Sequence, residues 1–274
     1  MHPYMTLYLN HTVTSEELTL AAQHPDILGA KLYPAGATTH STEGVSCIQD
    51  LYPLFDVMQT HDLVLQIHGE VNYGDIFERE AIFIETELKP LIRQFPALRI
   101  VLEHISTREA VDFIMQAPEQ VVATITPQHL MYHRNHLLAG GIKPHYYCLP
   151  VLKHEKDQRA IQQAACSGLP KFFAGTDSAP HARSHKEAAC GCAGIFSAPY
   201  AVACYAHIFE ELGALSKLDD FLSTFGANFY RLPKQTETIT LVKQPQLVAA
   251  SLPFGSEQVV PIAAGTQLNW SAYE

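Results

Sequence analysis

Residues 63–71 read LVLQIHGEV, an apolar run that ends on a histidine, a glycine and a carboxylate. The run is short, rich in leucine and valine, and does not alternate strictly between apolar and polar side chains. Strands of a parallel sheet that is covered on both faces have this pattern, because neither face meets water. We therefore predict a buried parallel strand that ends at or near His68.

Five further runs of this kind occur along the chain: MTLYLN (5–10), LGAKLYP (28–34), LRIVLEHI (98–105), VVATITP (121–127) and KFFAGTD (171–177). Amphipathic segments lie between them, and Thr14 with Glu17 has the spacing of a capping box. We expect helices over 45–61, 76–96, 154–167, 197–212 and 217–230. Strand and helix in alternation predict an α/β fold, either a closed barrel or an open doubly wound sheet. No glycine-rich phosphate loop follows any of these runs, which disfavours dinucleotide binding.

Charge and cysteine content narrow the class of partner. Lysine plus arginine total 18 against 28 for aspartate plus glutamate, which gives a formal net charge of −10. This balance argues against nucleic acid and favours a small molecule. The six cysteines are scattered without a paired framework, and no apolar leader precedes them, so we predict a reducing, cytoplasmic setting. No run reaches the roughly 20 apolar residues of a membrane span, so no membrane partner is expected.

Four of the six runs carry a possible metal ligand at or near their C-terminal end: Lys31, His68, His104 and Asp177. Any one of them is more simply explained as a hydrogen-bonded or ion-paired structural residue. In a parallel barrel, however, all strand C-termini open on one face, so residues far apart in sequence converge there. The coincidence of four such residues predicts a site at that face.

These residue types fit a pair of metal ions. Beside two metals a neutral lysine amine can add carbon dioxide, and the resulting carbamate offers one oxygen to each ion. His68 and His104 would supply neutral nitrogen to a borderline-soft ion such as zinc, and Asp177 a carboxylate oxygen. A bridging hydroxide that the metals acidify would then be a nucleophile near neutral pH.

Longer blocks around these residues resemble the bacterial-type dihydroorotases, zinc enzymes of the amidohydrolase superfamily. The similarity runs from about residue 4 to the C-terminal tail. The blocks are GAKLYPAGATT (29–39), IHGEV (67–71), LEHISTREA (102–110), TITPQHLMYHRNH (124–136), HYYCLPVLK (145–153) and GTDSAPHARSHKEAACGCAG (175–194).

This resemblance implies a (β/α)8 barrel that reversibly cyclises N-carbamoyl-L-aspartate to (S)-dihydroorotate in pyrimidine biosynthesis. It also implies two zinc ions per subunit and a homodimer. Carried over by motif, carboxylated Lys31 would bridge the two ions, His68 and His104 would bind one of them, and Asp177 the other. Asp177 would also carry a proton from the bridging hydroxide to the departing amide nitrogen.

The same resemblance implies a set of substrate contacts for this small anionic ligand. His181 would bind the substrate carboxylate, and the backbone at Leu149 and Ala193 would contact the pyrimidine ring. Thr38 and Thr39 would belong to a mobile loop that closes over the substrate. His129, His133 and His136 match a segment near the mouth of the barrel and are left without a role.

Two features of the family are absent from this sequence. The family's first strand carries His-x-His and is followed by an arginine, and its second strand supplies an asparagine; neither strand has a counterpart here. We therefore expect one barrel domain over 1–274 that is truncated at its N-terminus to about six strands, with 233–274 as an extended tail packing on the barrel. We also expect this chain to hold at most about one tightly bound metal, by ligand count, and to have negligible activity.

Three interpretations remain open at this point. The chain is a dihydroorotase with an incomplete sequence, a catalytically inactive relative that serves as an assembly partner, or an amidohydrolase for another cyclic amide.

Overall fold

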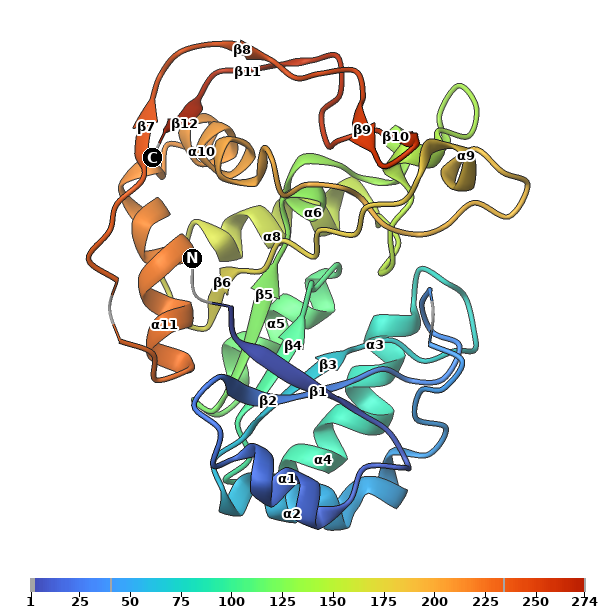
Figure 1. Cartoon of the computed structure of the whole chain (residues 1–274), viewed down its shortest axis with the longest axis vertical. Coiled ribbons are helices and arrows are strands. Elements are labelled where there is room, and N and C mark those ends of the chain that lie inside the picture. The colour runs from blue at the N-terminus through green and yellow to red at the C-terminus, as the bar shows by residue number, and fades with distance from the viewer. Residues whose placement is uncertain (1–2, 40, 234, 274) are drawn as a thin grey trace. The chain divides into compact units, whose positions relative to one another are not determined.

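The computed structural model describes residues 3–39, 41–233 and 235–273 (Figure 1). The chain forms two compact units. The first comprises Met1–Ile105 with Glu109–Thr124, and the second comprises Ser106–Arg108 with Ile125–Glu274.

Six strands form one sheet in which the hydrogen-bonding order is the chain order. The strands are β1 (Met5–Leu9), β2 (Ile27–Leu32), β3 (Val64–His68), β4 (Ile100–Glu103), β5 (Val121–Ile125) and β6 (Phe172–Ala174). Each neighbouring pair from β1 to β5 is parallel. Five of the six strands lie within the apolar runs of the sequence, and β2 begins one residue before its run, at Ile27. The predicted parallel α/β sheet is confirmed.

Burial differs across this sheet. All five residues of β5 are buried, as expected for a strand with neighbours on both sides and cover on both faces. Strand β1 stands at one end of the order, and its side chains Met5 and Tyr8 are 61% and 38% exposed. The inner strand β5 is therefore more deeply buried than the end strand β1.

The helices of the first unit follow its strands in alternation. They are α1 (Ser15–Ala21), the 3₁₀ turn η1 (Ile48–Leu51), α2 (Tyr52–Thr60), α3 (Arg79–Phe83), the π-helical segment η2 (Ile84–Leu88), α4 (Lys89–Gln94) and α5 (Arg108–Gln116). Figure 1 shows α1, α2 and α4 together on one side of the blue and cyan strands. The capping box that begins α1 is confirmed: Glu17 N donates to Thr14 Oγ1 at 3.2 Å, and Thr14 N donates to Glu17 Oε2 at 2.8 Å.

The second unit contains the remaining helices. They are α6 (Pro127–Met131), α7 (Arg134–Leu138), η3 (Pro144–Tyr146), α8 (Glu155–Ala165), α9 (Arg183–Lys186), α10 (Ala201–Glu211), η4 (Leu215–Lys217), η5 (Asp220–Thr224) and α11 (Phe225–Phe229). Helix α10 places Tyr205 at the centre of this unit, where its hydroxyl donates to Ile125 O at 2.7 Å. Burial raises the pKa of the Tyr205 hydroxyl, so it remains a donor at any physiological pH.

The tail beyond residue 238 is more ordered than a merely extended segment. It forms three short antiparallel pairs: β7 (Thr240–Val242) with β12 (Ser271–Tyr273), β8 (Gln246–Leu247) with β11 (Gln267–Leu268), and β9 (Leu252–Phe254) with β10 (Glu257–Val259). Trp270 Nε1 donates to Glu210 Oε2 of α10 at 3.1 Å. This contact ties the tail to α10, and Figure 1 shows β12 beside that helix.

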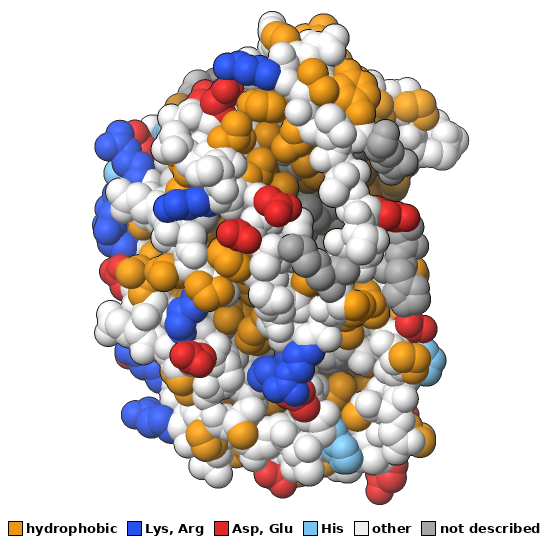
Figure 2. Space-filling model, turned by 90° about the vertical axis from the view of Figure 1, so that its left-hand side faces the viewer, with side chains coloured by type: hydrophobic (Ala, Val, Ile, Leu, Met, Phe, Trp, Pro, Cys, Tyr) orange, Lys and Arg blue, Asp and Glu red, His pale blue; other side chains and the backbone are white. Residues whose placement is uncertain are grey.

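The surface carries both signs of charge. On the face drawn in Figure 2, lysine and arginine side chains are interspersed with aspartate and glutamate side chains. Within the part of the chain that the structure describes, no helix combines the length and the hydrophobicity that a membrane crossing needs.

Candidate metal and substrate site

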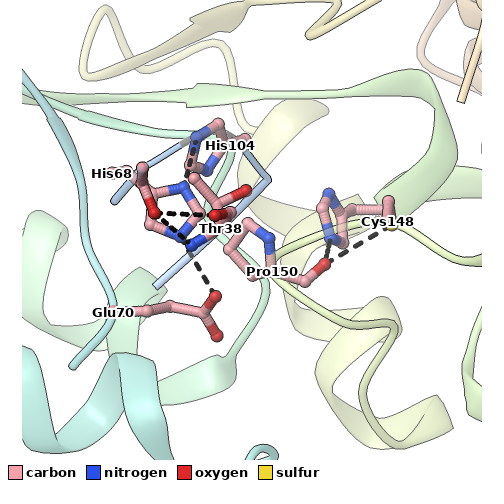
Figure 3. Close-up of polar contacts among 8 residues, drawn as sticks. Thr38, His68, Glu70, His104, Cys148 and Pro150 are labelled. Atoms are coloured by element: carbon pink, nitrogen blue, oxygen red, sulfur yellow. Dashed lines mark hydrogen bonds and ion pairs between the residues drawn. The ribbon is translucent and has the colours of Figure 1, made fainter. Parts of the chain in front are cut away.

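Two histidines of the first unit face each other at the ends of neighbouring strands. His68 is the last residue of β3, and His104 comes directly after β4. Both residues are buried, with 1% and 4% exposure, and their ring centroids are 4.8 Å apart. His68 Nδ1 lies 3.3 Å from His104 Nε2 (Figure 3). The two strand ends thus present a pair of ring nitrogens to one point.

The backbone at His104 explains why the two rings can meet. In a parallel sheet, residues in register share a face and successive residues alternate. His68 is in register with Glu103, so simple alternation would send His104 to the opposite face. His104 instead has φ +46°, in the left-handed region that β-carbon sterics disfavour. This conformation breaks the alternation and is compatible with the observed approach of the His104 ring to His68.

A threonine of β5 holds this unusual backbone. His104 N donates to Thr124 Oγ1 at 2.7 Å, and Ile105 N donates to Thr124 O at 3.1 Å. Thr124 is only 6% exposed, so its hydroxyl has little access to water. A residue of β5 therefore positions the histidine that follows β4.

Lys31 reaches the same neighbourhood from β2. Its register partner is Gln66, two residues before His68 on β3, so Lys31 and His68 share a face of the sheet. Lys31 Nζ makes a close ion pair with the Glu103 carboxylate and lies 4.9 Å from the centroid of the Tyr33 ring. The Tyr33 ring in turn is 6.2 Å from that of His68. Three strand ends thus bring Lys31, His68 and His104 to one side of the first unit.

The histidine pair fits one zinc ion. Two nitrogens that each lie about 2.0–2.1 Å from a tetrahedral zinc are about 3.3 Å apart. This separation agrees with the 3.3 Å between His68 Nδ1 and His104 Nε2. Among the described residues, no group of three or more His, Cys, Asp or Glu side chains is placed to hold a metal. Of the four predicted metal ligands, the first unit therefore contains the two histidines and Lys31, which could bind a metal after carboxylation.

Asp177 belongs to the second unit, where it follows β6 in an irregular loop. It is exposed and, like His104, has a positive φ, of +42°. Two serines hold the backbone on either side of it. Ser178 Oγ accepts from Ser197 N at 3.1 Å and from Ala198 N at 2.9 Å, and Ser197 Oγ donates to Thr176 O at 3.2 Å. The carboxylate is therefore carried on a loop with a fixed backbone.

His181 lies close to Gly194 in the same unit. A Cβ at position 194 would lie only 2.8 Å from His181 Cδ2, and Gly194 itself has φ +144°. Gly194 N also donates to Tyr147 O at 3.0 Å. A glycine is required here because the ring of His181 leaves no room for a side chain.

A single buried lysine joins the two segments that carry Leu149 and Ala193. Lys186 Nζ donates to three backbone carbonyls, those of Tyr147 at 2.7 Å, Cys192 at 2.9 Å and Gly194 at 2.7 Å. Burial lowers the pKa of Lys186 to about 8. Leu149 is half-buried and Ala193 is buried. Both predicted substrate contacts thus lie within two residues of a carbonyl that Lys186 holds.

Thr38 and Thr39 lie between β2 and η1 in the first unit, and both are half-buried. Thr38 N donates to Ser41 Oγ at 3.0 Å, and that hydroxyl donates back to Thr38 O at 2.6 Å. Figure 3 draws Thr38 in the close-up with His68. The predicted closure of this loop over substrate stays a prediction.

The other histidines and the cysteines have structural surroundings. His129 Nδ1 lies 2.8 Å from Thr126 Oγ1, and its Nε2 lies 2.9 Å from Pro150 O, so both ring nitrogens have hydrogen-bond partners. The rings of His133, the N-cap of α7, and His136 within that helix meet edge to face, with their centroids 4.5 Å apart. All six cysteines are free.

Sequence reasoning missed four residues that hold the predicted site in place: Glu70, Thr124, Lys186 and Ser197. Only Glu70 left a local signal, as a carboxylate two residues after a strand-end histidine. The other three act through contacts between residues distant in sequence, which composition and periodicity do not reveal.

Comparisons with known proteins identify the family of this chain. Residues 10–268 match the Amidohydrolase family. A dihydroorotase of Coxiella burnetii is 57% identical over 270 residues, which are 98% of this chain and 78% of that protein. The crystal structure of the Saccharomyces cerevisiae dihydroorotase in complex with 5-fluoroorotic acid has a TM-score of 0.91 at 36% identity, covering 98% of this chain and 80% of that one.

The dihydroorotase of Campylobacter jejuni has a TM-score of 0.90 at 33% identity, over 99% of this chain and 78% of that one. The resemblance read from the sequence is confirmed, as is an α/β fold of the TIM-barrel type. The chain belongs to the amidohydrolase family, with dihydroorotases as its relatives.

Proposed function

We propose that this chain is a zinc-dependent dihydroorotase that interconverts (S)-dihydroorotate and N-carbamoyl-L-aspartate in pyrimidine biosynthesis. The single observation that carries the proposal is the pair of buried nitrogens, His68 Nδ1 and His104 Nε2, which lie 3.3 Å apart. Relatives above 50% identity are named dihydroorotases, and the yeast relative was crystallised with a pyrimidine carboxylate, 5-fluoroorotic acid. These names support the choice of substrate.

The metal centre would be held by His68, His104, carboxylated Lys31 and Asp177. When bound, zinc supplies an acidified water as the nucleophile. In the hydrolytic direction the oxygen of a water molecule would add to the amide carbon of dihydroorotate, and the ring carbon–nitrogen bond would break. Asp177 would take the proton of the water and deliver it to the departing nitrogen, so that atoms and charge balance.

Lys31 has to change partner for this role. In the structure its Nζ pairs with the Glu103 carboxylate, a contact that favours the ammonium form. Carbon dioxide adds only to the neutral amine, so carboxylation requires this ion pair to be released. We expect carboxylation of Lys31 and metal binding to occur together, because metal ions stabilise the carbamate.

Substrate recognition would fall to the second unit and to the loop of Thr38 and Thr39. His181 would bind the substrate carboxylate, and the backbone at Leu149 and Ala193 would contact the ring. The acidic chain, at −10 overall, makes such a local donor necessary for an anionic substrate. We also infer a homodimer and a cytoplasmic setting, the latter supported by six free cysteines.

A second candidate, a non-catalytic relative, is favoured by one observation. The sequence contains no His-x-His pair, so two ligands of the resembling family have no counterpart in it. With these two ligands missing, we expect the chain to hold at most about one metal ion tightly, because metal affinity depends on the number of ligands.

The experiment compares the 274-residue chain with a version extended at its N-terminus by a segment that carries His-x-His. Zinc content and dihydroorotate hydrolysis are measured for both, with dihydrouracil as a cyclic amide that lacks the carboxylate. We expect the extension to raise zinc content and turnover, dihydroorotate to be preferred, and Asp177→Asn to abolish turnover without removing the histidine pair. Turnover of dihydrouracil alone would indicate another amidohydrolase. Absence of turnover in both chains would favour the non-catalytic candidate.

A further inference from the structure

The carboxylate of Glu70 contacts the ring of His68, the first of the two facing histidines. Strand β3 ends at His68, and two residues later Glu70 N donates to His68 O at 3.1 Å, which closes a tight turn. Gly69 at the centre of this turn packs directly on β4, since a Cβ there would lie 2.3 Å from Leu102 Cδ1. The turn is therefore held by the sheet.

The turn places the Glu70 side chain against one specific ring nitrogen. Glu70 is fully buried, at 0% exposure, and its Oε2 lies 3.2 Å from His68 Nε2 (Figure 3). A carboxylate accepts hydrogen bonds and cannot donate them. With Glu70 ionised, the proton in this contact belongs to Nε2 of His68. In the neutral imidazole the lone pair is then on Nδ1.

We infer that Glu70 is a positioning residue that holds His68 in the Nε2–H tautomer and thereby presents Nδ1 as the ligand atom. The inference rests on the proposed metal centre. His68 Nδ1 is the nitrogen that faces His104 Nε2, so the tautomer that Glu70 selects directs the lone pair toward the second histidine. A carboxylate behind a metal-binding histidine also orients the ring and raises its basicity.

His104 has a different arrangement. Its backbone N donates to the Thr124 hydroxyl, so the strand neighbour positions the main chain at His104. At His68 the carboxylate acts on the ring itself. If Glu70 orients the ring, it fixes the proton of His68 on Nε2, whereas a residue that only packs there would not. The tautomer of His68 therefore distinguishes the two roles.

The tautomer can be measured without metal or substrate. The metal-free chain is labelled with ¹⁵N-histidine, and the His68 signals are assigned by their loss in His68→Gln. We expect one-bond proton coupling at Nε2 of His68 and the shift of an unprotonated nitrogen at Nδ1. An Nδ1–H tautomer in the wild-type chain would overturn the inference, whatever the chain does with zinc.

Zinc affinity then tests the consequence, by competition with a chromophoric chelator. Glu70→Leu removes the acceptor and should lower zinc affinity about 10- to 100-fold, the usual cost of losing such a partner. Glu70→Gln keeps an amide oxygen that can accept from Nε2, and should retain the tautomer and most of the affinity. Glu80→Leu is the control, because Glu80 of α3 is also buried, at 1% exposure.

The outcomes separate this inference from the proposed function. If the wild-type chain shows the Nε2–H tautomer but binds no zinc, the metal centre is wrong and the tautomer assignment stands. If the wild-type chain binds zinc and Glu70→Leu binds it equally with an unchanged tautomer, Glu70 is only a packing residue. An equal loss in Glu80→Leu would likewise reduce the effect to general destabilisation.

Discussion

The two regions that carry the predicted site are built in different ways. The histidine pair of the first unit stands at the ends of the paired strands β3 and β4, where the left-handed backbone of His104 departs from the strand alternation and brings its ring to His68. Asp177 of the second unit stands on a loop after the three-residue strand β6, and side-chain hydroxyls hold that loop in place. In paired strands the regular backbone hydrogen bonds fix where each side chain lies. An irregular loop lacks these bonds, so side-chain hydrogen bonds have to hold its backbone.

Both regions nevertheless place a non-glycine residue with a left-handed backbone after the strand. His104 and Asp177 have φ values of +46° and +42°, which non-glycine residues adopt rarely. Each such residue costs about 1–3 kcal/mol and persists only when its surroundings impose it. Thr124 stabilises the first and the serine pair Ser178 and Ser197 the second. The comparison predicts that substitutions in one region will change metal binding and those in the other will change loop stability.

The largest effect is expected from loss of either facing histidine. His68→Ala or His104→Ala should reduce zinc affinity by at least about 100-fold, since loss of a mere outer partner already costs about 10- to 100-fold. His61→Ala is the matched control, because His61 is exposed at the end of α2. Chelator competition measures all three. A chain without His68 that binds zinc like the control would show that the metal lies elsewhere.

The next largest effect concerns Lys186, which holds three carbonyls of the loops around Leu149 and Ala193. Lys186→Met should lower the free energy of unfolding of the second unit by about 2–4 kcal/mol, because buried acceptors lose a charged donor. The exposed Lys156→Met serves as control. Urea unfolding gives the stability, and zinc affinity should stay unchanged. A parallel loss of zinc affinity would mean that the two regions are not independent.

Matched removal of one hydroxyl in each region sharpens the comparison. Thr124→Val and Ser197→Ala each delete one buried hydrogen bond and should cost about 1 kcal/mol, more if a donor is left unsatisfied. Only Thr124→Val should also weaken binding of the zinc ion held by the histidine pair, because it releases the backbone of His104, whereas Ser197→Ala acts on the loop of Asp177, the proposed ligand of the other ion. Thermal unfolding and chelator competition on both variants provide the measurements. Equal effects of both on zinc would contradict the division of roles.

The smallest effect is a pH dependence that Lys186 introduces. Its pKa is lowered by burial to about 8, below the roughly 10.4 of an exposed lysine. Between these values the unfolded chain binds more protons than the folded one, so the contribution of this group to the free energy of unfolding rises with pH. The thiols of Cys148 and Cys192, when ionised, oppose the shift.

We therefore expect the stability difference between wild type and Lys186→Met to grow in favour of wild type from pH 8 upward. Urea unfolding of both proteins across this range measures it, and the subtraction removes those titrating groups that do not interact with Lys186. A difference that stays flat or falls with pH would show that Lys186 titrates normally.

The fold was more predictable than the site because a buried strand is visible as a local run of apolar residues in the sequence. The run LVLQIHGEV and its five counterparts each gave a strand in the structure, since a buried strand needs an uninterrupted apolar stretch. The position of His104 could not be derived in this way. Strict alternation from Glu103 would place His104 on the face away from His68, and only its left-handed backbone reverses that placement.

The partners of the site were hidden for a related reason. Lys31 pairs with Glu103 across 72 positions of sequence, and Lys186 binds Tyr147 O across 39. Such contacts follow from strand order and loop packing, which a single sequence does not encode in its local pattern. Residues with a chemical role at strand ends were therefore visible, and those that orient them were not.

The central claim is that His68 and His104 bind one metal ion through the facing nitrogens. Zinc K-edge X-ray absorption of the zinc-loaded chain tests it most directly. The account predicts nitrogen and oxygen ligands at about 2.0–2.1 Å with outer-shell scattering from two imidazoles, and loss of that scattering in the His68→Ala, His104→Ala double variant. Sulfur ligands at about 2.3 Å, or a spectrum that the double variant leaves unchanged, would contradict it.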